Sequence, residues 1–286
     1  MLIAQITDVH LGFDPGNPEE MNRKRLDRVL KSLVAHRPLP DLLLATGDLV
    51  ENGNDVPSYK AFRDAIEGLP FPVHVAVGNH DSRQALLAVF PDTPVVDGSV
   101  QYAIEGFPVR ILVLDTMEHG RHGGGFDETK AAWLSARLAE APGKPTLLVL
   151  HHPPIETGLS WMTENPRAAW VKRLEAIVEP LDNIVGLVSG HLHRPVVTRW
   201  AGTTLAVCPS TAPLVALDLE PISSDQPDER AMVVTDRPYY ALHWWNGREL
   251  ITHFNTAEHH QILARFNPRR SALIRMLERE REQDGI

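Results

Sequence analysis

The chain has 286 residues, 43% of them hydrophobic, which is enough to form one large α/β domain with a substantial core. Its 28 Lys and Arg residues are outnumbered by 37 Asp and Glu residues, and the formal net charge of -9 opposes broad attraction to nucleic acid polymers or anionic membranes. The single cysteine, Cys208, excludes an internal disulfide framework, whereas 14 histidines make imidazole the available metal ligand.

The N-terminal stretch MLIAQITDVH has no basic region, no long apolar region and no small-residue cleavage site, so it does not predict a signal peptide. No apolar stretch of the sequence approaches the length that spans a membrane. We therefore expect a cytoplasmic protein whose lone cysteine is reduced.

Short apolar runs that predict strands alternate with patterns that predict amphipathic helices. The strands are expected over residues 2–7, 42–46, 73–77, 109–114, 146–150 and 184–188. The helices are expected on the apolar face made by Leu26, Val29, Leu30, Leu33 and Val34, and over residues 59–69, 129–140 and 168–179. This alternation predicts mostly parallel, buried strands with right-handed crossovers, so functional groups should gather beyond the carboxyl ends of the strands.

After residue 190 the pattern changes to strands alone. They are expected over residues 194–200, 203–207 and 232–235, followed by a hairpin in YYALHWWNGRELITHF that turns at Asn246 and Gly247. We expect these strands to form a second sheet that packs against the first. Residues 218–230 are polar and contain proline, which predicts a loop or an oligomer contact. Residues 269–283 predict a charged helix with a thin apolar stripe of Leu273, Ile274 and Leu277.

Polar side chains follow five of the predicted strands. They are Asp8 and His10, then Asp48, then Asn79, His80 and Asp81, then His151 and His152, and finally His191 and His193. In extended backbone residues i and i+2 point to the same side, so Asp8 with His10 can act as a pair of ligands unless a tight turn rotates them. Each group alone is more simply a turn or a satisfied histidine, but their conjunction at successive strand ends favours a metal site.

The number and type of these donors predict which metals would bind. Two Asp, one Asn and up to four His are too many for one tetrahedral ion, but they suit two ions that share the Asp48 carboxylate. Carboxylate, amide and imidazole donors without thiolate favour Mn, Fe, Co or Zn. The expected cofactors are therefore two divalent metal ions per chain.

The five groups match the motifs D-x-H at 8–10, G-D at 47–48, G-N-H-D at 78–81, H at 151 and G-H-x-H at 190–193. In these motifs the chain resembles the calcineurin-like metallophosphoesterase superfamily over residues 8–193. LHHPP at 150–154, LD at 114–115 and FDETKAAWLSARL at 126–138 resemble the branch of class III cyclic nucleotide phosphodiesterases and bacterial glycerophosphodiesterases.

The resemblance implies a four-layer α-β-β-α sandwich of two packed mixed β-sheets, with a binuclear metal site at the strand carboxyl ends. Residues 1–200 would form the catalytic core. Residues 201–286 would complete the second sheet within the same single domain, and their loop and helix would make oligomer contacts.

The resemblance also assigns roles to the site residues. One metal would take Asp8, His10, Asp48 and His193, and the other would take Asp48, Asn79, His151 and His191. His152 would then either support a ligand from behind or pack in the core. A hydroxide shared by the metals would attack phosphorus in line, and His80 would assist departure of the leaving oxygen. Asp81 would orient His80 and favour its protonated form.

The substrate is harder to predict from the residues. A phosphate monoester would be helped by several cationic side chains, whereas a diester carries one charge less. Arg121 and Arg194 are the candidates that the motif order suggests, and each is more simply a structural arginine. Trp161 and Met162 would either contact the organic part of a substrate or anchor their loop.

The closer resemblance favours hydrolysis of a small phosphodiester: a glycerophosphodiester, a cyclic nucleotide or a related alkyl or aryl diester. A homo-oligomer is expected, and a membrane or a nucleic acid polymer is not an expected partner. The alternatives are a phosphomonoesterase of the same fold and a noncatalytic scaffold, which would have lost ligands that this chain retains. A nuclease is disfavoured because the sequence has no basic stripe.

Overall fold

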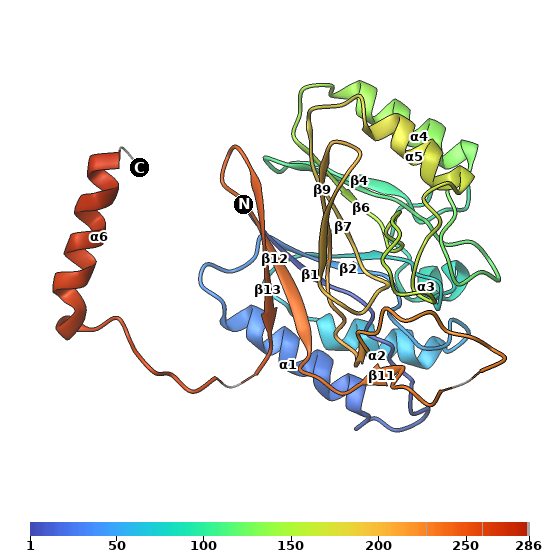
Figure 1. The fold of residues 1–286 in the computed structure, drawn as a ribbon, viewed down its shortest axis with the longest axis horizontal. Helices are drawn as coiled ribbons and strands as arrows, with labels where there is room; N and C mark the ends of the chain where they lie inside the picture. Colours follow the sequence, from blue (N-terminus) through green and yellow to red (C-terminus); the bar gives the residue numbers. More distant parts are fainter. Residues whose placement is uncertain (227, 259, 285–286) are drawn as a thin grey trace.

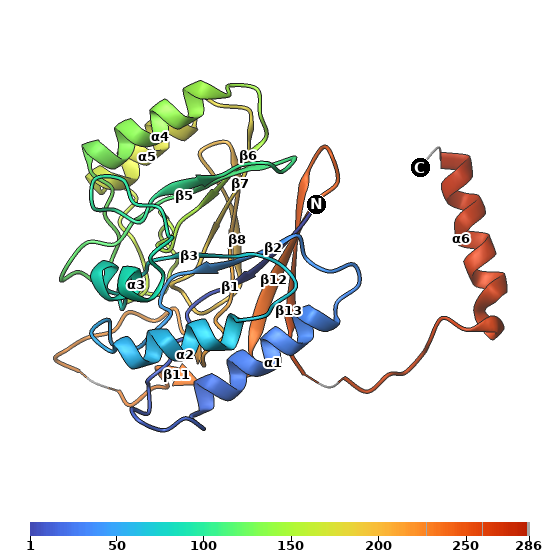
Figure 2. The ribbon, with the colours of Figure 1, turned by 180° about the vertical axis from the view of Figure 1, so that it is seen from behind.

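The structure is a computed structural model that describes residues 1–226, 228–258 and 260–284. Two β-sheets pack face to face in the body of the molecule, and Figures 1 and 2 show helices covering their outer faces. The helices α1 (Met21–Ala35) and α2 (Val56–Ile66) cover one sheet, while α4 (Glu128–Glu140) and α5 (Ala169–Val178) cover the other. The predicted sandwich of two mixed sheets is confirmed.

The first sheet has the order β13-β12-β1-β2-β3. The strands β1 (Leu2–Ile6), β2 (Leu42–Thr46) and β3 (Val73–Ala76) are parallel. The strand β12 (Tyr239–Trp245) runs antiparallel to β1, with Leu2 opposite Trp244, and β13 (Leu250–Thr256) runs antiparallel to β12.

The second sheet has the order β4-β5-β6-β7-β9-β8. Its parallel strands are β5 (Arg110–Val113), β6 (Thr146–Val149), β7 (Ile184–Ser189) and β9 (Thr203–Val207). The edge strands β4 (Tyr102–Ile104) and β8 (Val196–Trp200) are antiparallel to their neighbours. A separate pair, β10 (Leu214–Val215) and β11 (Val233–Val234), forms a small ribbon.

Alternation along the strands divides the core into two layers. Ile111 and Val113 of β5 belong to the cluster that also contains β1, β2 and α1, whereas Leu112 belongs to the cluster under α4 and α5. Successive side chains of a strand point to opposite faces, so β5 contributes to the space between the sheets and to the space under its own helices. Both faces are buried, which explains the continuous apolar runs of the sequence.

Two expectations about the sheets are wrong in detail. The six predicted βα strands do not share one sheet, because the chain crosses after α3 (Arg83–Val89) and starts the second sheet with the β4-β5 pair. The C-terminal hairpin does not join the second sheet; it covers the edge of β1 that β2 leaves open. Two of the strands predicted after residue 190, β8 and β9, do lie in the observed second sheet, beside β7.

The last part of the chain leaves the body after residue 257. Figures 1 and 2 show α6 (Ser271–Asp284), preceded by the short 3-10 helix η1 (Pro268–Arg270), standing apart from both sheets. Its Leu273, Met276 and Leu277 are exposed. Of the segment assigned to the C-terminal part, residues 227, 259, 285 and 286 lie outside the described residues. Among the helices of the described chain, none is both long and apolar enough to span a bilayer.

Candidate metal centre

The carboxyl ends of strands from both sheets meet around one cluster of His and Asp side chains. Asp8 and His10 follow β1, Asp48 follows β2, Asn79 and His80 follow β3, His151 and His152 follow β6, and His191 and His193 follow β7. Four overlapping groups of these His and Asp side chains have ligand atoms within 4.8 Å of one another, and each group could hold a metal ion. The fold therefore brings the seven predicted ligands together.

The first group contains Asp8, His10 and His193. His193 Nε2 lies 3.4 Å from Asp8 Oδ1, and His10 Nε2 lies 3.1 Å from His193 Nε2. Behind the rings, His193 Nδ1 donates to the carbonyl of Pro213 at 2.8 Å, and His10 Nδ1 donates to Glu51 Oε2 at 2.8 Å. These bonds use the ring protons, so in neutral rings both Nε2 atoms present lone pairs to each other, an arrangement that a cation between them stabilises.

The second group centres on His151, whose ring is fully buried. Its Nδ1 donates to the carbonyl of Thr46 at 2.8 Å, while its Nε2 has no hydrogen-bond partner. That Nε2 lies 3.3 Å from Asp48 Oδ2 and 3.8 Å from Asp8 Oδ1. A buried ring nitrogen that faces two carboxylates fits a divalent cation, which would satisfy all three groups at once.

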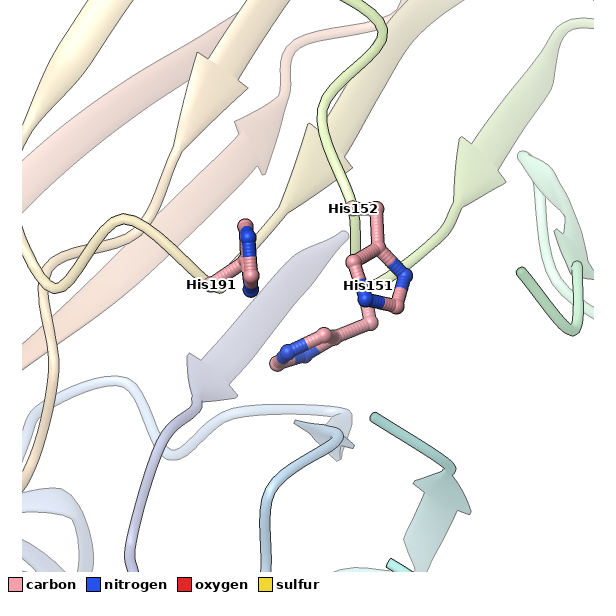
Figure 3. Close-up of side chains that lie close together, drawn as sticks. All are labelled: His151, His152 and His191. Carbon is pink, nitrogen blue, oxygen red and sulfur yellow. The ribbon is translucent and has the colours of Figure 1, made fainter. Parts of the chain in front are cut away.

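Asn79 completes this second group. Its Oδ1 lies 3.1 Å from His191 Nδ1 and 3.2 Å from His152 Nε2. Figure 3 shows the rings of His151, His152 and His191 gathered beyond the ends of their strands. The Asn79 amide oxygen can only accept, so the neutral His152 ring donates to it through Nε2, and its Nδ1 then accepts from the Thr116 hydroxyl at 2.9 Å. His152 therefore contacts the predicted ligand Asn79, which corresponds to the supporting role among its two expected alternatives.

The ligand-bearing turns use an unusual backbone. Asp8, His10, Asp48, His191 and His193 all have positive φ, between 49° and 71°. The turns thus rotate the pairs out of the extended geometry in which residues i and i+2 share a side. Only glycine fits at position 78, because a Cβ there would lie 2.2 Å from Asp48 Oδ1.

The electrostatics of the cluster are those of a site that attracts cations. Burial alone would raise the pKa of Asp48, but His151, His10 and His80 hold it well below its usual range. Burial alone would lower the pKa of His151, but Asp48 and Asp8 raise it to about 9. A proton on His151 thus balances the buried carboxylates, and a bound cation would replace that proton.

His80 and Asp81 occupy different places. His80 Nδ1 donates to the carbonyl of Glu51 at 2.9 Å, and its ring lines the cavity in front of the cluster. The Asp81 carboxylate accepts from the Tyr59 hydroxyl and from the Gly78 amide, both at 2.9 Å, and from the Leu49 amide at 3.2 Å. Burial and the charge of Asp48 raise the pKa of Asp81 to about 7.

The expectation that Asp81 orients His80 is therefore wrong. Asp81 holds the turn after β2 to the turn after β3, because its carboxylate is occupied by backbone amides of both turns. Glu51 takes the orienting role, with its side chain on His10 and its backbone carbonyl on His80. Sequence reasoning missed Glu51, whose one signal is its place three residues after Asp48 in the same loop.

The cluster opens into a cavity of about 440 Å³. Its predicted site residues are His10, Asp48, Asn79, His80, His191 and His193, and among the lining residues that the structure describes there is no Lys or Arg. Arg194 instead donates to the carbonyl of Val215 at 2.8 Å, and Arg121 pairs with Glu118 at 3.0 Å. Trp161 and Met162 line the cavity and also pack on the core under α5.

Comparison with known proteins agrees with this geometry. The family model described as calcineurin-like phosphoesterase matches residues 1–195. The chain is 30% identical over 258 residues to a probable glycerophosphodiester phosphodiesterase GpdQ of Arcobacter nitrofigilis, covering 88% of this chain and 91% of that protein. It is 30% identical over 212 residues to the 3',5'-cyclic adenosine monophosphate phosphodiesterase CpdA of Escherichia coli K12, covering 73% of this chain and 75% of that protein.

Solved structures support the fold. A dimetal phosphatase from Danio rerio superposes with a TM-score of 0.64 at 14% sequence identity, covering 90% of this chain and 96% of that one. At this identity the likeness concerns the fold alone.

Proposed function

The chain belongs to the calcineurin-like phosphoesterase family and is a phosphoric diester hydrolase, and from that premise we propose that it hydrolyses small phosphodiesters at a centre of two divalent metal ions. The observation that carries the proposal is the buried His151 Nε2, which has no hydrogen-bond partner and faces the carboxylates of Asp8 and Asp48.

The residues that would hold the ions fall into two sets that share Asp48. Asp8, His10, Asp48 and His193 would form one set, and Asp48, Asn79, His151 and His191 the other. The fixed Nδ1 bonds of His10, His151 and His193 support this assignment, because they leave Nε2 to point at the carboxylates. Nitrogen and oxygen donors without thiolate favour Mn, Fe, Co or Zn. Bound ions would supply neutralisation of phosphate charge and activation of water.

His80 would act on the leaving group. Because its Nδ1 donates to the Glu51 carbonyl, a second proton on Nε2 would point into the cavity and pass to the departing oxygen. The Glu51 carboxylate lies 4.0 Å from His80 Nδ1. The chain needs no nucleophilic side chain of its own, and the only cysteine, Cys208, is buried.

The charge of the cavity supports a diester over a monoester. A monoester dianion usually meets Arg or Lys side chains, and none is among the described residues that line this cavity. A diester monoanion needs less positive charge and relies on the shape of the pocket for its second substituent.

The proposal is tested on metal-stripped protein reloaded with manganese, with bis(4-nitrophenyl) phosphate beside 4-nitrophenyl phosphate. We expect the diester to be preferred. Asp48→Asn should lose turnover and bind fewer than two ions per chain, whereas the exposed Asp64→Asn serves as a matched control. Full metal content with retained turnover in Asp48→Asn would refute the bridging role. Preference for the monoester would indicate a phosphatase, and silence on both esters a noncatalytic scaffold.

A further inference from the structure

Part of the cavity lining is apolar and includes none of the proposed hydrolytic residues. We call this part the apolar wall; it consists of Phe13, Met21, Val215, Met232, Val233 and Val234. Phe13, Met232 and Val233 are 65%, 60% and 53% exposed, although each is a large apolar side chain. Exposed apolar side chains that gather beside a polar cluster indicate a surface that a ligand or a partner covers when it binds.

The wall is held in register with the metal centre by hydrogen bonds to the ligand turns. His193 Nδ1 donates to the carbonyl of Pro213, and Arg194 donates to the carbonyl of Val215, both at 2.8 Å. Val215 of β10 pairs with Val233 of β11, so the second strand of the ribbon is connected to the same turn through β10. The β10-β11 side of the wall is therefore fastened directly to the G-H-x-H turn.

The other side of the wall is fastened to the D-x-H turn. The buried Asn22 donates its amide to the carbonyl of His10 at 2.8 Å, which fixes Met21 next to that ligand. The buried Glu20 carboxylate accepts from the amides of Gly12 at 2.7 Å and Asp14 at 3.0 Å, and so holds the loop that carries Phe13. Both sides of the wall are thus preorganised by the residues that flank the metal ligands.

The distribution of polar groups decides what the wall can bind. The cavity is lined both by the His and Asp side chains of the cluster and by the methionine, valine and phenylalanine side chains of the wall. Against the methionine, valine and phenylalanine side chains of the wall, a glycerol or sugar substituent would give up hydrogen bonds to water that these side chains cannot replace. An alkyl or aryl group would lose only contact with water.

Resting on the proposed function, we propose that the apolar wall binds one organic substituent of the substrate. The preferred substrates are then monoanionic phosphodiesters in which that substituent is an apolar alkyl or aryl group. Glycerol diesters are expected to be poorer substrates for this chain.

The test compares two diesters with the same leaving group, 4-nitrophenyl hexyl phosphate and 4-nitrophenyl 2,3-dihydroxypropyl phosphate. On manganese-loaded protein we expect kcat/KM to favour the hexyl ester by about tenfold or more. Calorimetric titration with hexyl(methyl)phosphinate and its 2,3-dihydroxypropyl counterpart, which have no ester bond to cleave, should give the same preference in dissociation constant.

The near-isosteric double variant Met232→Gln and Val233→Thr should bring both ratios close to one. Val197→Thr is the matched control, because Val197 is also an exposed valine on a strand, 60% exposed on β8, and does not line the cavity. It should keep the full preference.

The possible failures are separable. Diester turnover without a hexyl preference, or a preference that survives the double variant, would overturn the inference and leave the proposed function standing. A double variant that changes only the oligomeric mass in light scattering would identify the wall as a subunit contact and would also overturn it. If no diester is turned over, the proposed function fails, and the phosphinate ratio still decides whether the wall binds apolar groups.

Discussion

Glu51 offers a sharp test of how the metal centre is held, because it contacts two site histidines through different atoms. Its carboxylate accepts from His10 Nδ1 at 2.8 Å, and its backbone carbonyl accepts from His80 Nδ1 at 2.9 Å. The bond to His10 also holds the pKa of Glu51 below its usual range, so the carboxylate is ionised. Glu51→Ala removes the first contact and keeps the second, which isolates the support of His10.

The size of the effect follows from this geometry. Carboxylates behind metal-binding histidines are worth about 10–100-fold in metal affinity. The Glu51 side chain is 36% exposed, so solvent screens its charge and the lower end applies. We expect Glu51→Ala to weaken metal binding by about tenfold, or about 1.4 kcal/mol. Glu51→Gln keeps an acceptor oxygen without the charge and should lose less.

The assay is competition between the protein and a chelator for manganese, with Glu249→Ala as a control at an exposed carboxylate that pairs only loosely with Arg248. Unchanged metal affinity in Glu51→Ala would refute the support of His10. Equal losses in the Ala and Gln variants would show that the charge, and not the accepting oxygen, carries the effect.

Three further predictions concern other parts of the chain. His80→Ala should slow diesters with poor leaving groups by about tenfold or more beyond its effect on 4-nitrophenyl esters, and equal losses in kcat would exclude an acid role. Burial lowers the pKa of His243 to about 3, so the unfolded chain binds this proton first and the fold loses stability as the pH falls. Between pH 7.5 and pH 5 this contribution is about 2 kcal/mol, and His243→Gln should remove that part of the pH dependence of urea unfolding; parallel profiles would contradict it. Removal of residues 268–286 should keep turnover and lower the oligomeric mass, since α6 exposes an apolar stripe away from the body, and an unchanged mass would exclude α6 from subunit contacts.

The sequence predicts the elements of this fold well and their partition between sheets poorly. Apolar runs and Gly-Asp or Gly-His endings locate the strands, because burial and turn chemistry are local properties. Strand neighbours are a long-range property. Ile111 and Leu112 are both buried although they face different layers, so their run carries no alternation that would tell which sheet β5 joins. The edge strand β4 has only three residues and gave no signal.

The ligands of the site were predictable as residue types at strand ends, whereas their supports were not. His80 and Asp81 are adjacent in sequence, which suggested that they interact. In the structure their side chains diverge, and the Asp81 carboxylate accepts hydrogen bonds from backbone amides that no sequence pattern reveals. Glu51 reaches His10 across 41 residues of chain, so only the folded arrangement shows it.

The strained turns explain why so many supports are needed. A non-glycine residue with positive φ costs about 1 kcal/mol or more, and such residues concentrate at functional sites. Here Asp8 and Asp48 carry this cost and also hold the turns that impose it: Asp8 Oδ2 accepts from the His191 amide at 2.9 Å, and Asp48 Oδ1 accepts from the His80 amide at 2.8 Å.

The two buried carboxylates therefore have two uses, one toward the backbone and one toward a cation. Their mutual repulsion favours separation, whereas the turns force them against the same histidine, His151, at 3.3 and 3.8 Å. A fold that keeps like charges and left-handed backbone together without gain would be selected against, because every such feature lowers stability. Binding of a cation, as proposed, would supply the compensating free energy at the place where the strain, the buried charge and the unpartnered nitrogen occur together.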